Sequence, residues 1–314
     1  MKWNKKGLIY EPNRSLGWSK HYGILPTPVY SSKENKLKVF FATADELRDS
    51  RVYSLDLNPQ HPSKVLSEVN GPLLDLGMPG CFDDCGVVPS CVLEEEGKTH
   101  LYYIGFQRLE KVPYLLLAGR ATWKNSSNEF VRESSTPVLE RTHEEPFVRS
   151  APTIIKENGL YKMWYVSASH WEKIDTSLFN NKVLPNYKIR YAESNDGLQW
   201  KPLNISVDYE HKDEFGFGRP WVIKYNKRYY MWYSIRRRNT SYRIGFAHSD
   251  DGILWKRRDD LMEFDVSPEG WDSEMVCYPA VLEMADRFLL FYNGNKNGDT
   301  GFGYAELPKG EFVV

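Results

Sequence analysis

The sequence predicts an all-β fold in which one structural unit recurs five times along the chain. The unit is clearest at 219–233, RPWVIKYNKRYYMWY, where a proline opens an apolar run, a polar hairpin tip follows and a second aromatic run ends the unit. Further copies begin at Pro28, Pro89, Pro152 and Pro279. A unit that recurs about every 60 residues indicates a repeat architecture, because one unit cannot bury its faces without neighbours. Five copies in 314 residues predict a single domain, a five-bladed β-propeller that spans residues 1–314.

The two ends of the chain predict how the ring of blades closes. The N-terminal segment KWNKKGLIY, around Trp3, resembles the segments that begin at Trp123, Trp200 and Trp255, each of which leads into the outer strand of a repeat. The C-terminal segment TGFGYAEL reads as a third strand with no fourth strand after it. We therefore expect the N-terminal strand to complete the last blade, which would leave the ring without a free sheet edge.

The remaining elements follow from turn residues and apolar runs. The blades are expected to begin near Trp18, after the Gly/Pro-rich segment GPLLDLGMPG, and near Phe147, Phe215 and Ser273. Turn tips such as KENG, YNKR, SNDG and SDDG carry the Gly, Asn and Asp that tight hairpins favour. The segments ADELRDS at 44–50 and HWEKIDTSLFNNKVLPNY at 170–187 are interpreted as loop insertions. No helix of more than a few turns is predicted.

Two hairpins carry a recurring turn motif. The segments SNDGLQW at 194–200 and SDDGILW at 249–255 resemble the Asp-box hairpins of sialidase propellers. In that motif Ser and Asp cap the turn and Trp packs between blades, so we interpret both hairpins as folding devices. Four residues are therefore set aside as site candidates: Asp196, Trp200, Asp251 and Trp255.

Composition and charge exclude several classes of partner. The net charge is −1, and the only cationic cluster is the short RRR at 236–238, so nucleic acid is not an expected partner. The N-terminal segment has no apolar run long enough for a signal peptide or a membrane helix, so we expect a cytoplasmic protein that does not insert into membranes. The four cysteines lack paired CxxC spacing and are interpreted as free thiols, with a zinc site from the first three as the alternative. We expect no metal and no cofactor, and the oligomeric state is left open.

Candidate catalytic residues come from counting backwards from each repeat proline. In a propeller the residues before each inner strand surround the central channel, and the loops between second and third strands form its rim. Asp84 and Glu274 each lie five residues before a repeat proline, with Glu214 one step earlier in its repeat and Asp83 beside Asp84. Acids near a propeller axis lose hydration and need a partner or a function. We therefore interpret Asp84 and Glu274 as the catalytic pair, with Glu214 and Asp83 in reserve.

Candidate substrate-binding residues lie in the same two places, before the inner strands and in the rim loops. Arg149 and Arg219 precede repeat prolines, and a planar guanidinium suits sugars, carboxylates and phosphates. The alternative is that these two arginines only neutralise the acids in a structural network. His21 takes the position of Asp84 and Glu274 if Pro26, and not Pro28, is the first repeat proline. The rim candidates are Gln107, Arg108, His170, Trp171, Arg236, Asn293 and Asn295.

Taken together, the five repeats, the carboxylates before inner strands and the hairpin pattern YxIxxAxSxDGxxW resemble the five-bladed propeller glycosidases, relatives of glycoside hydrolase families 43, 32 and 130, over the whole chain. Arg149-Ser150-Ala151-Pro152 stands where family 32 has Arg-Asp-Pro, and the blade-one Asp of family 43 is missing, which indicates a divergent branch. The resemblance implies a glycosidase or phosphorylase acting on an oligosaccharide or sugar conjugate, with phosphate as a second partner in the phosphorylase case. One carboxylate would be the general acid and the other would activate water or phosphate.

Two other functions use the same site. A carbohydrate-binding propeller without catalysis is suggested by the missing blade-one carboxylate. A glycosyl-transferring enzyme of polysaccharide assembly would use the same residues with an activated donor. Sugar identity, linkage and the assignment of acid and base are left open.

Overall fold

The computed structural model describes residues 1–313, and within this range the side chains of residues 204–206 are not described. The described chain is nearly all β-structure. Its strands fall into five consecutive units of four, and within each unit neighbouring strands pair antiparallel. The repeated strand units that the sequence predicted are therefore present along the described chain.

The first unit contains β2 (His21–Ser31), β3 (Lys36–Ala44), β4 (Ser50–Leu57) and β5 (Asn70–Leu74). The second contains β6 (Gly86–Glu95), β7 (Lys98–Arg108), β8 (Tyr114–Lys124) and β9 (Glu129–Arg132). The third contains β10 (Val148–Glu157), β11 (Leu160–Ile174), β12 (Lys182–Ser194) and β13 (Lys201–Val207). The fourth contains β14 (Glu214–Tyr225), β15 (Arg228–Arg237), β16 (Arg243–Ser249) and β17 (Lys256–Arg257). The fifth contains β18 (Cys277–Glu283), β19 (Arg287–Asn293), β20 (Phe302–Pro308) and β1 (Asn4–Tyr10).

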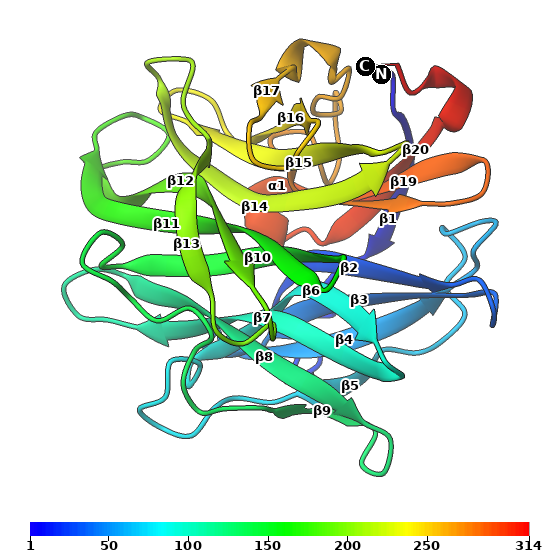
Figure 1. The fold of residues 1–314 in the computed structure, drawn as a ribbon, viewed down its shortest axis with the longest axis horizontal. Helices are drawn as coiled ribbons and strands as arrows, with labels where there is room; N and C mark the ends of the chain where they lie inside the picture. The colour runs from blue at the N-terminus through cyan, green and yellow to red at the C-terminus, as the bar shows by residue number, and fades with distance from the viewer. Residues whose placement is uncertain (314) are drawn as a thin grey trace.

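The N-terminal strand lies in the last unit, where the sequence predicted it. β1 pairs antiparallel with β20, from Asn4 opposite Glu306 to Tyr10 opposite Phe302. In Figure 1 the two termini lie side by side, and the first strands β2, β6, β10 and β14 lie towards the middle of the molecule while β9 and β17 lie at its edge. Single parallel pairings, Ser50 with Gly86 and Arg149 with Leu117, link neighbouring units. The first strands of all five units therefore gather around one centre.

Each first strand carries a β-bulge at the same place. Two consecutive residues there face one residue of the second strand, as Ala151 and Pro152 do opposite Tyr165. The first residue of the pair has a positive φ in four units, at Leu25, Ala151, Arg219 and Tyr278. A bulge changes the direction of the side chains around it and is a reliable marker of equivalent positions. The five units can therefore be aligned by strand register alone.

This register corrects the proline used in the first unit. The bulge falls at Leu25 and Pro26, so Pro26 is the repeat proline and Pro28 is not. His21 consequently lies five residues before the repeat proline, the position that Glu274 occupies in the fifth unit. From the sequence alone either Pro26 or Pro28 could be the repeat proline, because the two lie two residues apart in one strand.

The register also corrects the position of Asp84. In the second unit the bulge pair is Pro89 and Ser90, so Ser90 takes the place that a proline has elsewhere. Asp84 therefore aligns with Glu214 and not with Glu274. Counting from the proline failed here because Pro89 occupies the bulge position that has a positive φ in the other units, a conformation that proline cannot adopt.

The two predicted Asp-box hairpins have the structural role expected of them. The Asp196 carboxylate accepts the amides of Leu198 and Gln199, and Asp251 accepts the corresponding amides in its own turn. Trp200 packs edge-on against Tyr102 of the second unit and Tyr161 of the third. Each hairpin thus stabilises the packing between neighbouring units.

One loop assignment was wrong. The segment 170–187 is mostly strand, because β11 continues to Ile174 and β12 begins at Lys182, and these extensions pair with each other. Only residues 175–181 lie outside the two strands. The helical content of the described chain is limited to α1 (Asn295–Gly298) and two short 3-10 turns, η1 (Asp259–Leu261) and η2 (Lys309–Glu311).

Two features bear on the environment of the protein. None of the helices in residues 1–313 is long and apolar enough to cross a membrane. All four cysteines are free thiols, with Cys81 and Cys85 half-buried and Cys91 and Cys277 buried.

Deleting residues 1–12 should destabilise the protein strongly. The deletion removes β1, exposes the edge of β20 and removes Lys5, which pairs with the buried Asp272. We expect the melting temperature to fall by more than about 10 °C, the shift that corresponds to several kcal/mol in a chain of this size. Thermal unfolding followed by circular dichroism measures this, with the full-length Lys5→Met variant as the control for the lost ion pair alone. An unchanged melting temperature in the truncated protein would contradict a stabilising role for β1.

Candidate functional site

Four of the five units contain a buried tyrosine that binds a carboxylate. The tyrosine lies on the second strand and donates its hydroxyl. The pairs are Tyr103–Asp83 (2.9 Å), Tyr165–Glu145 (2.9 Å), Tyr233–Asp259 (2.8 Å) and Tyr292–Asp272 (2.9 Å). A cation completes each cluster, namely Arg132, Arg190, Arg257 and Lys5 respectively. We call these the Tyr–acid–cation clusters. They explain acids near the first strands structurally, because a buried carboxylate is stable when hydrogen bonds and a cation compensate its lost hydration.

Asp83 belongs to one of these clusters. Its side chain is fully buried, and its Oδ2 accepts the Tyr103 hydroxyl at 2.9 Å and Nε of Arg132 at 2.7 Å. The carboxylate therefore joins the second strand of its unit, β7, to the outer strand, β9. Burial and the neighbouring Asp83 carboxylate raise the pKa of Tyr103. This arrangement favours a structural role for Asp83.

Glu214 is also held by an arginine. Nη1 and Nη2 of Arg257 donate to its two carboxylate oxygens at 2.8 and 2.9 Å, and the amides of Glu210 and His211 donate to Oε2. Burial alone would raise the pKa of Glu214, but the hydrogen bonds from Arg257 and the two amides outweigh it and lower the pKa to about 2. A carboxylate this strongly ionised is a poor general acid, so Glu214 is better explained as a structural partner of Arg257.

Asp84 differs from these acids because it takes part in no ion pair of the described residues. It is half-buried, and Oδ2 accepts the amide of Gly80 at 2.8 Å. Oδ1 is buried without a hydrogen-bond partner among the described residues. Burial and the adjacent Asp84 carboxylate raise the pKa of the Cys85 thiol. Asp84 thus has one carboxylate oxygen that no described residue satisfies.

Glu274 is the second predicted catalytic acid that takes part in no ion pair of the described residues. Its side chain is exposed, while its backbone is held firmly. The Glu274 amide donates to Oδ1 of Asn295 at 2.8 Å, and its carbonyl accepts the Ser241 hydroxyl and Nη1 of Arg243. Asn295, a predicted rim contact, therefore positions the strand start that carries Glu274. The carboxylate itself is left available for a ligand.

The two predicted arginines do not neutralise Asp84 or Glu274. Arg149 is buried against Glu145, with Nε at 2.6 Å from the carboxylate. Arg219 lies at the centre, where its guanidinium donates to the carbonyls of Pro26, Tyr278 and Ser90 and to the Thr27 hydroxyl, from three different units. Burial lowers the pKa of Arg219 to about 9. The alternative network between these arginines and the predicted catalytic acids is therefore absent from the described residues, and Arg219 joins units at the centre.

His21 lies beside a carboxylate that the sequence analysis missed. Its Nδ1 is 3.8 Å from Oδ1 of Asp299, and Nη2 of Arg14 donates to Oδ2 of the same residue at 3.0 Å. Asp299 follows α1 in the loop between β19 and β20, the type of loop that forms the rim. Asp299 carries no recognisable motif, and only the fold brings it to His21.

The other rim candidates divide into structural and exposed side chains. Asn293 is fully buried and binds the backbone of Gly23 and Leu25, which joins the fifth unit to the first. Gln107 donates to the Cys81 carbonyl, and Arg108 donates to the Leu47 carbonyl and pairs with Asp49. His170 is exposed and contacts Ser169. In residues 1–313, no group of three or more His, Cys, Asp or Glu residues is arranged to hold a metal ion.

Arg236 and Trp171 lie in one aromatic cluster. Nε of Arg236 donates to the Tyr242 hydroxyl at 2.7 Å, and its guanidinium lies 4.8 Å from the ring centre of Tyr187. The Tyr187 hydroxyl is 3.0 Å from that of Tyr114, which packs edge-on against Trp171. Tyr278 completes the group by contacting Tyr242. We call the six residues Tyr114, Trp171, Tyr187, Arg236, Tyr242 and Tyr278 the Arg236 cluster. Its four tyrosines were missed by the sequence analysis because they belong to hairpins of different units.

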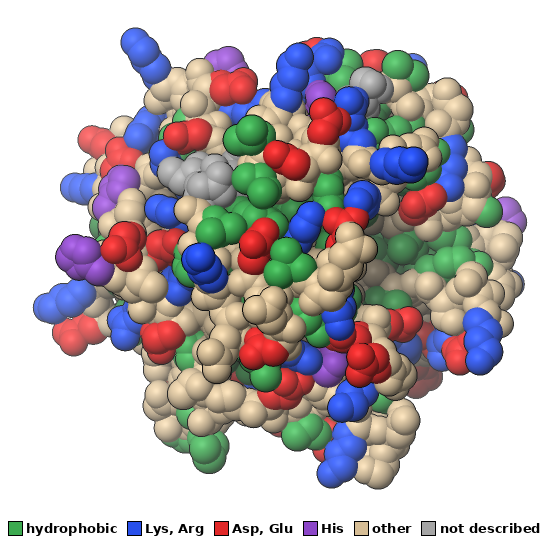
Figure 2. All heavy atoms as spheres, in the orientation of Figure 1, with side chains coloured by type: hydrophobic (Ala, Val, Ile, Leu, Met, Phe, Trp, Pro, Cys, Tyr) green, Lys and Arg blue, Asp and Glu red, His purple; other side chains and the backbone are tan. Residues whose placement is uncertain are grey.

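Apolar side chains from the starts of several first strands pack beside this cluster. Leu25, Val148 and Ala151 are buried there, and Ile24 and Val88 are half-buried against them. Figure 2 shows hydrophobic side chains near the middle of one face of the molecule, interspersed with charged ones. Aromatic and apolar surfaces next to a few polar groups are typical of sugar-binding sites.

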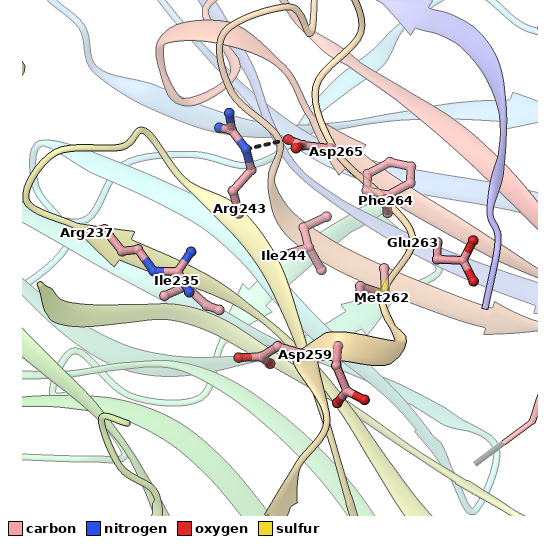
Figure 3. Close-up of a pocket in the computed structure, with 10 residues that line it drawn as sticks. Ile235, Arg237, Arg243, Ile244, Asp259, Met262, Glu263, Phe264 and Asp265 are labelled. Atoms are coloured by element: carbon pink, nitrogen blue, oxygen red, sulfur yellow. Dashed lines mark ion pairs between the residues drawn. The ribbon is translucent and has the colours of Figure 1, made fainter. Parts of the chain in front are cut away.

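A separate cavity lies on the fourth unit and contains none of the predicted site residues. It measures about 620 Å³ and is lined by Ile235 and Ile244 together with charged residues such as Arg243 and Asp265 (Figure 3). Asp265 pairs with Arg243, and Asp259 pairs with Arg257. Because these acids are already neutralised, this cavity offers less for acid–base chemistry than the starts of the first strands.

The chain has a close relative along its full length. It is 32% identical over 308 residues to the uncharacterized protein Rv1502 of Mycobacterium tuberculosis, which covers 98% of this chain and 99% of the relative. This chain belongs to the Rv1502 family. No protein-family model matches the chain.

Solved structures with the same fold are glycoside hydrolases. One, described as a glycoside hydrolase, has a TM-score of 0.74 at 17% identity and covers 99% of this chain and 93% of its own. A thermostable family-43 glycoside hydrolase gives 0.59 at 16% identity, covering 95% and 91%. The GH32 β-fructofuranosidase BmSUC1 of Bombyx mori gives 0.61 at 13% identity, covering 91% and 61%. The resemblance to glycosidases of families 32 and 43 that the sequence indicated is thus confirmed at the level of the fold, and the link to family 130 stays a prediction.

Replacing Glu214 by Gln should reduce stability in a pH-dependent way. The folded-state pKa of Glu214 is about 2, below its ordinary value of 4.5, so the ionised carboxylate stabilises the fold above pH 4.5. This contribution is about 3 kcal/mol at neutral pH and is lost as the pH falls from 4.5 towards 2. Urea denaturation at pH 7 and pH 3 should therefore show a large difference between wild type and Glu214→Gln at pH 7 and a smaller one at pH 3.

The control for this prediction is Glu269→Gln. Glu269 is exposed and takes part in no ion pair of the described residues, so its replacement should change stability little at either pH. An equal loss of stability for Glu214→Gln at both pH values would contradict the ionised pair with Arg257.

Proposed function

We propose that the chain is a five-bladed β-propeller enzyme that cleaves a glycosidic bond. The five four-stranded units would be the blades of one domain, and β1 would close the ring by completing the fifth blade. The proposal is supported by the antiparallel pairing of β1 with β20 and by the TM-score of 0.74 with a solved glycoside hydrolase. The four free thiols favour a reducing compartment, so we place the enzyme in the cytoplasm.

The proposed catalytic pair is Asp84 and Glu274. This choice rests on one observation, which is that the other acids near the first strands are already paired with cations. Asp83, Glu145, Glu214 and Asp272 are all bound to cations, whereas Asp84 and Glu274 enter no ion pair of the described residues. Both lie at the starts of first strands, where the propeller geometry would direct them to the same central region.

The proposed chemistry is general acid–base catalysis. One carboxylate, protonated, would give its proton to the leaving oxygen, and the other, ionised, would take a proton from the attacking water. A separation of about 6.5–9.5 Å between the two carboxyl groups in a substrate complex would leave room for that water and give inversion. At about 5–5.5 Å the ionised carboxylate would instead attack the anomeric carbon, and water would then release the covalent intermediate with retention. Inorganic phosphate in place of water would make the same site a phosphorylase. His21 occupies the position in the first unit that Glu274 occupies in the fifth, and Asp299 lies beside it. Both would contact the sugar.

Replacing either proposed acid by its amide should greatly reduce turnover without unfolding the protein. We expect Asp84→Asn and Glu274→Gln each to reduce the turnover number by about 10²–10⁴-fold, because the amide keeps the shape of the side chain but cannot transfer the proton. The melting temperature should stay within a few degrees of wild type, since neither carboxylate supports an ion pair of the described residues. Single-turnover assays with aryl glycosides and oligosaccharides, with and without phosphate, measure the effect.

The matched control is again Glu269→Gln, an exposed acid in the segment before β18 that should leave turnover unchanged. Full activity in both Asp84→Asn and Glu274→Gln would rule out this pair. Saturable sugar binding by the wild type with no cleavage, phosphorolysis or transfer would instead favour a non-catalytic carbohydrate-binding propeller.

A further inference from the structure

Arg236 is a buried cation with no carboxylate partner. Its exposed fraction is 7%, and no ion pair of Arg236 occurs among the described residues, although its neighbours Arg237 and Arg238 both pair with acids. Nε donates to the Tyr242 hydroxyl and Nη1 to the Pro185 carbonyl at 3.2 Å. Nη2 has no hydrogen-bond partner in the described part of the chain. One arm of a buried guanidinium is thus left unused.

The other buried arginine without an acid shows what a purely structural arrangement looks like. Arg219 uses both terminal nitrogens, and these reach three carbonyls and one hydroxyl of the surrounding strands. Arg236 has only one carbonyl, and rings surround the rest of its charge, with Tyr187, Phe215 and Tyr242 4.8–5.3 Å from the guanidinium. Aromatic rings stabilise a cation but do not satisfy its N–H groups. Arg219 also has one buried donor, Nε, without a partner among the described residues, but both of its terminal nitrogens are bonded, whereas the terminal Nη2 of Arg236 is not.

The groups around Arg236 also supply donors and no negative charge. The Tyr242 hydroxyl accepts from Arg236 and has its own proton to give, and the Tyr278 hydroxyl has no hydrogen-bond partner among the described residues. Burial raises the pKa of Tyr187, Tyr242 and Tyr278, which keeps these hydroxyls neutral at pH 7. Nε1 of Trp171 is a further buried donor without an acceptor in the described chain. A surplus of donors around a cation is the complement of an oxyanion.

The cluster lies next to the proposed catalytic site. The Tyr242 carbonyl accepts the amide of Val276, two residues after Glu274, and the adjacent Ser241 hydroxyl binds the Glu274 carbonyl. Tyr114, Trp171 and Tyr278 are half-buried, so the cluster reaches the molecular surface. A ligand that contacts Glu274 would therefore lie close to the strands that carry the Arg236 cluster.

We infer that Arg236 and the tyrosines around it bind an anionic group, so that the substrate is a charged sugar, with a carboxylate or a phosphate as its charged substituent. This inference rests on the proposed function and specifies its substrate class. Nη2 of Arg236 and the Tyr278 hydroxyl donate to the oxyanion, and the ring faces exclude water around it. Because Arg236 has no competing carboxylate, the bound anion supplies the missing counter-charge.

The test compares matched neutral and charged sugars on the intact protein. Glucose and glucuronate, and galactose and galacturonate, are titrated against wild type by calorimetry, together with inorganic phosphate. We expect each uronate to bind more tightly than its neutral partner. In Arg236→Gln the affinity for the uronate should fall at least about tenfold, the effect of losing a hydrogen bond to a charged group, while the affinity for the neutral sugar stays the same. Arg236→Lys, which keeps the charge without the planar fork, should retain part of the preference.

The control variant is Arg228→Gln, which removes an arginine at the other end of the same strand, where it pairs with the exposed Asp250. It should preserve the preference for uronates. Phosphate that competes with the uronate in wild type but not in Arg236→Gln would identify a free anion as a second source of the charge. If Arg236→Gln does not fold, Arg236→Lys carries the test, and a full wild-type preference for uronates in that variant overturns the inference. Equal binding of neutral and charged sugars by wild type overturns it as well.

The outcomes also separate this inference from the proposed function. Cleavage of neutral aryl glycosides with no preference for charged sugars would overturn the anion site and leave the glycosidase proposal intact. A preference for uronates that depends on Arg236, without cleavage of any glycoside, would support the anion site and contradict the enzyme. A uronate preference that survives in Arg236→Gln overturns the assignment to Arg236.

Discussion

A buried or half-buried carboxylate needs a cation and hydrogen-bond donors, and this constraint explains how one acid and one basic residue are arranged in each of four units. Asp83, Glu145, Asp259 and Asp272 each accept a tyrosine hydroxyl and face a basic side chain. The cation comes from a strand further out in the unit, so each cluster fixes the outer part of the unit to its second strand. In the first unit Phe41 takes the place of the tyrosine, and no acid is paired at this position among the described residues.

The same constraint separates structural acids from functional candidates. Once the Tyr–acid–cation clusters and the Arg257–Glu214 pair are accounted for, Asp84 and Glu274 stand apart, because neither enters an ion pair of the described residues. Their backbones are nevertheless held, since the Asp84 amide donates to the Cys81 carbonyl and the Glu274 amide donates to Asn295; only Oδ2 of the Asp84 side chain is used, by the Gly80 amide. A firmly positioned backbone with an uncommitted side chain is the arrangement that catalysis needs.

The two buried arginines without acids show how similar side chains take different roles. The two terminal nitrogens of Arg219 donate to carbonyls of the strands around the centre, which stabilises the convergence of these strands. Arg236 has rings on its faces and an unused nitrogen. The sequence made both of them candidate substrate-binding residues, Arg219 before a repeat proline and Arg236 on the rim. Only the identity of the neighbouring atoms distinguishes a structural cation from one that can bind an anion.

The sequence by itself determined the repeats, the strand order, the pairing of the N-terminal strand with the last unit and the two Asp-box turns, because these depend on local turn chemistry and on apolar periodicity. It also led to Asp84 and Glu274, although by a count that was one residue off in the second unit. Tertiary structure decided the bulge register, the partners of Asp83 and Glu214, and the meeting of His21 with Asp299 and of Arg236 with its tyrosines. These depend on the direction of side chains from different units, which no local pattern encodes, since neighbouring residues of a strand point to opposite faces and a bulge reverses that order.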